Sequence, residues 1–262
     1  MDSTIIVLSK ISKNKFYGKM IYSNGVKLIG KFKNNILQGK GKMYLAYAEC
    51  SGTFIDNKLQ GKGKIISFSG EKYYGTFIDN KLQGKGEIII TNAKCYGTFI
   101  DSKFQGRGVI KFKDGNIYNG TFINNKLEDF GEHILPNGER HLCLFQQNKI
   151  IKITKIYFPN KSIYEGTFIN DKLNGDGKIY LPNKDLIVGS FVDNVLQGKG
   201  FHYYNNGEIH SGIYKDGKLD GEGELIINYC NLILKVIFKD NKIVGNYNIK
   251  LSNGQDLCMT IN

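Results

Sequence analysis

Hydrophobic and polar residues alternate in short runs along the chain, and pairs of Asn, Asp or Gly residues separate the runs. Alternation with a period of two is typical of β-strands, and Asx-Asx or Asx-Gly pairs favour tight hairpin turns. No stretch keeps the 3.6-residue apolar period of an amphipathic helix. The pattern therefore predicts an all-β protein in which consecutive strands pair antiparallel.

The same pattern recurs at a fixed interval. The twelve residues GTFIDNKLQGKG occur at positions 52–63 and again, letter for letter, at 75–86. Aligning the chain on the aromatic residue of this motif gives ten repeats spaced 22 to 24 residues apart, with anchors at Phe32, Phe54, Phe77, Phe99, Phe122, Phe145, Phe168, Phe191, Tyr214 and Phe238. A fixed period of this length indicates a repeat architecture. We expect an elongated, single-layer antiparallel meander of about ten 23-residue β-hairpin repeats.

The whole chain, residues 1–262, is predicted to form one continuous array. Its parts are a degenerate N-terminal cap (1–27), regular repeats (28–139), a degenerate repeat (140–162), regular repeats (163–233) and a C-terminal cap (234–262). The degenerate repeat keeps its anchor but has Cys143, Lys152 and Thr154 in place of glycines. We expect it to pair like the others, and the alternative is a bend or a partner site. Atypical terminal repeats are expected of capping strands.

Each repeat is predicted to close with a type I′ turn at its Asx pair, such as Asp56-Asn57. Counting outward from a two-residue turn places Phe54 opposite Leu59 and Gly52 opposite Gly61. Alternation then puts aromatic residues, glycine and leucine on one face, and Thr, Ile, Lys and Gln on the other. Glycines opposite the large rings would let the rings lie flat across the neighbouring strand.

The same count places Gly84 opposite Gly75 in the next repeat, where an added side chain would overpack the ring layer.

A second class of turn is predicted at the Asx-Gly pairs Asn24-Gly25, Asp114-Gly115, Asn137-Gly138, Asn206-Gly207 and Asn253-Gly254. Counting outward from these pairs places His141 opposite Ile134 and His210 opposite Tyr203. Histidines that share a repeat position are three repeats apart, so no two are expected to meet. No metal site is predicted.

The composition narrows the class of protein. The five cysteines are odd in number, far apart and without a CxxC pair, which disfavours a disulfide framework and favours a reducing, cytoplasmic location. No convincing secretory signal and no apolar run near the ~20 residues of a membrane helix occur. No nucleophile motif, phosphate loop or convergent pair of carboxylates stands out either. We therefore expect no enzymatic activity, no cofactor and no catalytic residue.

The net charge is +12, and basic residues recur at two repeat positions, which form two columns on the face opposite the rings. The candidate residues for binding an anionic partner are Lys40, Lys58, Lys62, Lys81, Lys85, Lys103 and Arg107. Like charges would recur about every 9–10 Å, close to the Debye length. The alternative is that the lysines only keep the sheet soluble and protect its edges. Nucleic acid is disfavoured because aromatic stacking platforms are scattered on this face.

Four segments carry a family resemblance: YYGTFIDNKLQGKG (73–86), YNGTFINNKLEDFG (118–131), YEGTFINDKLNGDG (164–177) and HSGIYKDGKLDGEG (210–223). They resemble the MORN repeat, whose pattern is Y-x-G-x-[FWY]-x-x-[GDN]-x-x-x-G-x-G. The resemblance covers nearly the whole chain, with ten units in register. It implies a long, twisted, single-layer sheet with a groove, and roles in scaffolding, oligomerisation and tethering at membranes or the cytoskeleton. Some members of the family carry a separate lipid kinase or SET domain, for which the repeats leave no residues here.

We therefore expect a non-enzymatic scaffold or protein-interaction module in the cytoplasm, with association to membrane or cytoskeleton. One alternative is a peripheral membrane tether that binds anionic lipids through the basic columns. Another is a regulatory subunit whose groove holds a segment of a separate enzyme. A homodimer through a terminal edge strand is also expected, and the C-terminal DLCMTIN is the favoured edge because it carries only one charge.

Overall fold

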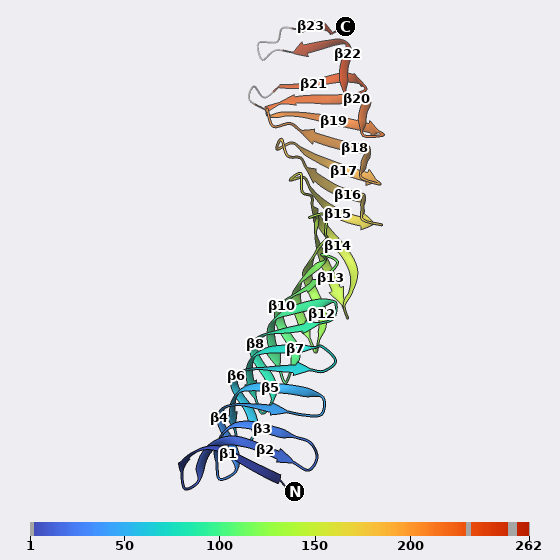
Figure 1. The fold of residues 1–262 in the computed structure, drawn as a ribbon. Helices are drawn as coiled ribbons and strands as arrows, with labels where there is room; N and C mark the ends of the chain where they lie inside the picture. The colour runs from blue at the N-terminus through green and yellow to red at the C-terminus, as the bar shows by residue number, and fades with distance from the viewer. Residues whose placement is uncertain (1–2, 229–231, 251–255, 262) are drawn as a thin grey trace. The chain divides into compact units, whose positions relative to one another are not determined.

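The computed structural model describes residues 3–228, 232–250 and 256–261. The chain divides into two compact units, one made of Met1–Pro136 and Phe145–Lys149, the other of Asn137–Leu144 and Ile150–Asn262. In each unit, strands that follow one another in sequence pair antiparallel, and Figure 1 shows them stacked in chain order. The predicted all-β antiparallel meander is confirmed.

The strands of the first unit are β1 (Ser3–Ser12), β2 (Lys15–Tyr22), β3 (Lys27–Lys33), β4 (Ile36–Tyr44), β5 (Ala48–Ile55), β6 (Lys58–Ser67), β7 (Lys72–Ile78), β8 (Lys81–Ile90), β9 (Ala93–Ile100), β10 (Lys103–Phe112), β11 (Ile117–Ile123) and β12 (Lys126–Ile134). Residues of β13 (Arg140–Gln146) and β14 (Lys149–Tyr157) belong to both units. The strands of the second unit are β15 (Ile163–Ile169), β16 (Lys172–Tyr180), β17 (Leu186–Val192), β18 (Val195–Tyr203), β19 (Glu208–Lys215), β20 (Lys218–Ile227), β21 (Leu232–Lys239), β22 (Lys242–Lys250) and β23 (Asp256–Ile261).

The Asx pairs form the predicted type I′ turns, and their second residue also binds the preceding repeat. Asp56 and Asn57 have φ of 50° and 63°, so both lie in the left-handed region that this turn requires. The Leu37 N–H donates to Asn57 Oδ1 at 2.7 Å, and the Asn57 N–H donates back to the Leu37 carbonyl at 3.3 Å. The same reciprocal pair recurs between Asn80 and Leu59. The turn therefore closes its own hairpin and fastens it to the previous one.

Beyond the turn, the predicted register is wrong. Phe54 does pair with Leu59, but Gly52 pairs with Gly63 instead of Gly61, because Gly61 and Lys62 form a bulge. Gly61 has φ of 74°, a backbone conformation that glycine adopts at little cost. Across the next strand pair, Gly61 lies opposite Phe77. A glycine does face rings such as Phe54 and Phe77, but it belongs to the preceding repeat.

The paired glycines allow a leucine to cover two strands at once. A Cβ added to Gly63 would lie 2.9 Å from both Leu59 Cδ1 and the Ser51 carbonyl oxygen. Leu59 is fully buried, as is Phe54 beside it. In the repeat where phenylalanine replaces this leucine, Phe104 stacks between Phe99 and Phe122 with ring centroids 4.9 and 4.0 Å apart. The ring and leucine layer is therefore the core of the sheet, confined to one face.

The Asx-Gly turns are wider than predicted. At Asn206-Gly207 only the glycine has a positive φ, of 89°. The Tyr204 N–H donates to the Glu208 carbonyl at 2.8 Å, and Asn206 Oδ1 accepts from the Glu208 N–H at 3.0 Å. The loop thus follows the type I turn with a left-handed glycine that three-residue hairpin loops use. Asn253-Gly254 lies outside the described residues.

The degenerate repeat pairs with the next repeat over a short ladder. Strands β14 and β15 are in register over only three residue pairs, from Lys155 with Glu165 to Tyr157 with Ile163. Side chains occupy the space that glycines leave elsewhere, since Cys143 is buried and the Thr154 hydroxyl donates to the Leu142 carbonyl at 3.2 Å. The division between the two units falls in this repeat.

The bulge glycine and the paired glycine should respond differently to substitution. Contrary to the predicted register, Gly84 lies opposite Phe99 in open space with φ of 73°, so a side chain there would not overpack. A Cβ on Gly86 would lie 2.8 Å from the Tyr74 carbonyl oxygen. We expect Gly86→Ala to lower the free energy of unfolding by about 1–3 kcal/mol.

The matched control is Gly84→Asn, because asparagine tolerates the left-handed region and Asp129 occupies the corresponding bulge position with φ of 64°. Its cost should stay below about 1 kcal/mol. Chemical denaturation of both variants measures the difference, and a Gly84→Asn cost equal to that of Gly86→Ala would contradict the assignment.

Candidate functional site

The two predicted columns of basic residues differ in whether their charges have acidic partners. Lys58, Lys81 and Lys103 follow the type I′ turns, and two of them meet acidic turn residues of the next repeat. Lys58 Nζ lies 3.5 Å from Asp79 Oδ1, which also accepts from Gln60 Nε2 at 2.8 Å. Lys81 Nζ lies 3.7 Å from Asp101 Oδ1. In this turn column the lysine charge is largely compensated, and it helps to join neighbouring repeats.

The other four residues form a row across the sheet. Lys40 lies opposite Thr53, Lys62 opposite Thr76, Lys85 opposite Thr98, and Arg107 opposite Thr121. We call this set the cation–threonine row. All four basic side chains are exposed, and none of them forms an ion pair with another described residue. The row therefore presents uncompensated positive charge, whereas two of the three lysines of the turn column are paired.

Paired glycines continue across the strands beside this row, and at its Arg107 end a trough lies on the face opposite the rings. It holds a pocket of about 520 Å³ whose floor is the backbone of Gly97, Gly108 and Gly120. Arg107 and Phe130 line one side, and Tyr96, Val109, Asn119 and Glu132 line the other. The Asn119 side chain donates to Glu132 Oε2 at 3.1 Å. A Cβ added to any of these glycines would point toward Phe104 or Leu127 on the ring face, so on this face the three strands present backbone between the two rows of side chains.

Phe130 is a site residue that the sequence analysis missed. It is 64% exposed, and it occupies the position that Lys62, Lys85 and Arg107 hold in earlier repeats. The signal was available, since the fifth repeat reads EDFG where the regular motif reads QGKG. The cation–threonine row therefore ends at an exposed aromatic ring.

The corresponding row in the second unit has a different charge. Asp176 lies opposite Ser190 and accepts a hydrogen bond of 2.6 Å from its hydroxyl, and Glu222 lies opposite Ile237. Only Lys199 retains the positive charge of the regular motif. The positive row is therefore a property of the first unit.

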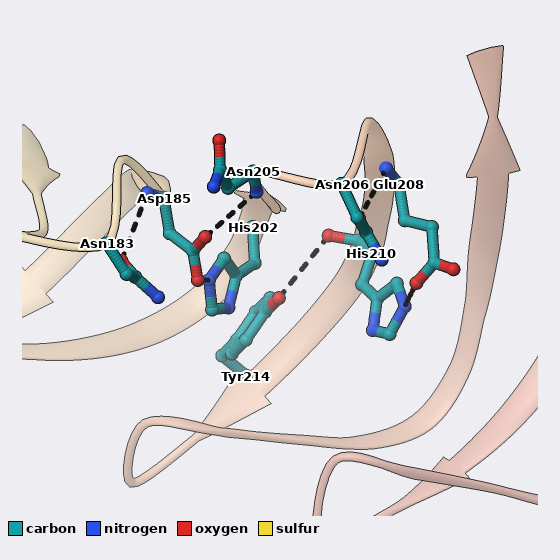
Figure 2. Close-up of polar contacts among 8 residues, drawn as sticks. All are labelled: Asn183, Asp185, His202, Asn205, Asn206, Glu208, His210 and Tyr214. Atoms are coloured by element: carbon teal, nitrogen blue, oxygen red, sulfur yellow. Dashed lines mark hydrogen bonds and ion pairs between the residues drawn. The ribbon is translucent and has the colours of Figure 1, made fainter. Parts of the chain in front are cut away.

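Two histidines are cross-strand partners in the second unit, where the sequence predicted no such pair. His210 lies opposite His202, not opposite Tyr203, because the wide Asn206-Gly207 loop shifts the register. His202 Nε2 lies 3.0 Å from Asp185 Oδ2, and its ring stacks on Tyr204 with centroids 3.8 Å apart. Figure 2 shows both histidines with their carboxylate partners.

Burial and hydrogen bonding shift the pKa values of Asp185 and His210 in this cluster. Burial alone would raise the pKa of the Asp185 carboxyl, but hydrogen bonds from the Asn205 backbone N–H and from His202 outweigh it and hold the pKa below its usual value. Burial lowers the pKa of His210, and Glu208, 3.7 Å away, only partly offsets this effect. The Tyr214 hydroxyl donates to the His210 carbonyl at 3.3 Å. Burial of the His210 ring, which contacts Phe238, therefore favours its neutral form.

Among the described residues, no group of three or more His, Cys, Asp or Glu residues is placed to hold a metal ion. No helix in the described part of the chain is long and apolar enough to cross a membrane.

Comparisons with known proteins identify the repeats. A family model described as the MORN repeat matches residues 29–46, 50–72, 73–92, 95–117, 164–186, 188–209 and 210–227, which together exceed half of the chain. No curated protein matches this sequence.

Three solved structures are similar over much of their length. The TCP10 domain of Danio rerio CPAP in complex with a STIL peptide is 12% identical over 99% of both chains, with a TM-score of 0.27. The SAS-4 TCP domain of Drosophila melanogaster with a proline-rich motif of Ana2 is 12% identical over 80% of this chain and 90% of that one, with a TM-score of 0.24. A streptogramin B lyase is 10% identical over 100% of this chain and 87% of its own, with a TM-score of 0.16. At these scores the three structures carry no conclusion about this protein.

The histidine cluster predicts a pH-dependent stability of the second unit. The pKa of His210 is lowered in the folded state, so its neutral form stabilises the fold above about pH 6.5, and this contribution is lost as pH falls through the folded pKa. We expect a lower Tm at pH 5.5 than at pH 7.5, and a smaller difference in His210→Gln. Protonation of the Asp185 carboxyl would change the stability in a separate pH range, below about pH 4. Equal pH-dependent falls in Tm for the wild type and the variant would show that His210 is not responsible.

Proposed function

The chain belongs to the MORN-repeat family, and from this premise we propose that it is a non-enzymatic scaffold that binds protein partners along its repeat array. Membership of this family supports the general role of a repeat-based interaction module. The observation that carries the proposal for this chain is the open trough of the first unit, where three strands present glycine backbone beside uncompensated cations and an exposed ring. An open surface of this kind suits an extended polypeptide better than a small substrate.

The division of polar groups within the repeat supports the same proposal. The turn Asx residues and the lysines after them largely bond to neighbouring repeats, so they hold the array together. The cation–threonine row makes no ion pair with the described residues and remains exposed. Thiols that form no disulfide at Cys50 and Cys95 fit the proposed cytoplasmic location.

We also propose that two copies of the chain associate through β1. Strand β1 pairs with β2 on one side, and its large apolar residues Ile5, Ile6, Val7, Leu8 and Ile11 are 39–65% exposed. Lys10 is its only charged residue. A long, apolar edge with little charge favours pairing with another strand, and a two-fold axis lets one edge serve both copies. The side chains of DLCMTIN, the edge that the sequence favoured, lie outside the described residues.

The scaffold proposal is tested by affinity purification of the tagged full-length chain from its native cell, followed by cross-linking and mass spectrometry. We expect one or more proteins in near-stoichiometric amounts, cross-linked to lysines of the first unit. Recovery of a catalytic chain would make the array a regulatory subunit. Binding to anionic vesicles with no protein recovered would favour a membrane tether and contradict the scaffold proposal.

The dimer proposal is tested by adding charge to the edge. Leu8 and Ile11 are the most exposed large apolar residues of β1, at 65% and 56%. We expect the wild type to have the mass of a dimer in light scattering and Leu8→Lys/Ile11→Lys to have that of a monomer, because charged edge strands resist pairing. The control is Ile55→Lys/Ile78→Lys, at similarly exposed positions on inner strands, which should leave the dimer intact. A monomeric wild type would refute the proposal.

A further inference from the structure

The cation–threonine row has a regular spacing that a ligand can match. Each repeat contributes two strands, and neighbouring strands lie about 4.7–4.9 Å apart, so successive cations recur about every 9.4–9.8 Å. The row has four of them, Lys40, Lys62, Lys85 and Arg107, each facing a threonine of the next strand. It crosses the strands at one level, next to the row of paired glycines that forms the floor of the trough at the Arg107 end.

Polyproline II is the chain conformation that fits this spacing. It has three residues per turn and rises about 3.1 Å per residue, so every third side chain points the same way at intervals of about 9.3 Å. In a β-strand, residues three apart point to opposite faces, and an α-helix repeats every 5.4 Å. A ligand in polyproline II conformation could therefore place one side chain at each cation.

We propose that the trough binds an extended acidic segment of a partner protein, in polyproline II conformation, with a carboxylate at every third residue facing the cation–threonine row. The inference rests on the proposed scaffold function and names the surface and the chemistry of the partner. Four carboxylates at this spacing would each reach one of the four cations, which have no acidic partner among the described residues.

The opposite wall and the far end of the trough set the orientation of the segment. Glu132 lies on the opposite wall of the pocket, so a carboxylate of the segment at this end would face Arg107 and avoid repulsion by Glu132. Beyond Arg107 the row ends at Phe130, which is 64% exposed and shares the pocket with Tyr96 and Val109. Aromatic-lined grooves are the usual receptors of polyproline II segments. An apolar residue of the segment, one repeat past its last carboxylate, would pack on Phe130.

The spacing is tested directly with peptides. A labelled peptide of four Glu-Pro-Pro triplets holds polyproline II conformation and places a carboxylate at every third residue. Its control has the same composition with the four glutamates in succession. In fluorescence polarisation with the full-length protein, we expect the spaced peptide to bind about threefold to tenfold more tightly, since only it aligns all four ion pairs. Equal affinities would overturn the proposal.

Two double variants with the same change in net charge locate the site. Lys62→Gln/Lys85→Gln removes two cations of the row and should weaken the spaced peptide about threefold to tenfold. Lys58→Gln/Lys81→Gln removes two ion-paired lysines of the turn column and should leave the affinity unchanged. Equal losses in the two variants would indicate general attraction to a basic protein and would overturn the proposal.

Two further outcomes separate this inference from its alternatives. If phosphatidylserine vesicles bind through Lys62 and Lys85 while neither peptide competes, the row serves a lipid surface and the proposal is wrong. If the proteins recovered by affinity purification stay bound to Lys62→Gln/Lys85→Gln, the acidic-segment proposal is wrong while the scaffold function stands. Loss of those proteins in this variant alone, with competition by the spaced peptide, supports both.

Discussion

The fold depends on a close approach of neighbouring backbones at the paired glycines. At Gly52 and Gly63 any added Cβ would meet a carbonyl oxygen and the Leu59 methyl groups. With no side chain between the strands, the leucine covers both of them, and the anchor ring packs beside it in the buried layer. No single hairpin could bury these groups from water, because hairpins are at best marginally stable alone. Stability therefore comes from stacking one repeat on the next.

The twelve-residue motif is repeated because most of its side chains act between repeats. Asn80 binds the backbone of Leu59 in the preceding repeat. Asp79 accepts a hydrogen bond from Gln60 of that repeat and forms an ion pair with its Lys58. The residues that remain for recognition are those next to the glycines on the opposite face, such as Lys62 and its threonine partner. Assembly and recognition thus use different faces and different positions of one short motif.

The candidate site could be predicted only in part. The seven basic residues were found from their period, because lysines at a fixed offset must share a face of a regular sheet. Their division into a compensated column and an exposed row depends on which repeat supplies an aspartate within reach of Lys58, and this follows from strand pairing. Phe130 was overlooked because a lone aromatic residue in a strand reads as core. The cross-strand pairing of His202 with His210 depends on the width of the Asn206-Gly207 loop.

The sequence by itself determined the strands, the antiparallel order, the type I′ turns and the repeat family, because each leaves a local signal of period or residue type. The tertiary structure decided the register beyond the turn, the short pairing at the degenerate repeat and the environment of each charge. A strand glycine such as Gly61 can be read either as a paired residue or as a bulge, and only contacts with the next repeat choose between them. One such choice shifts all later pairs of the hairpin, so pairings far from the turn lie beyond what local pattern can predict.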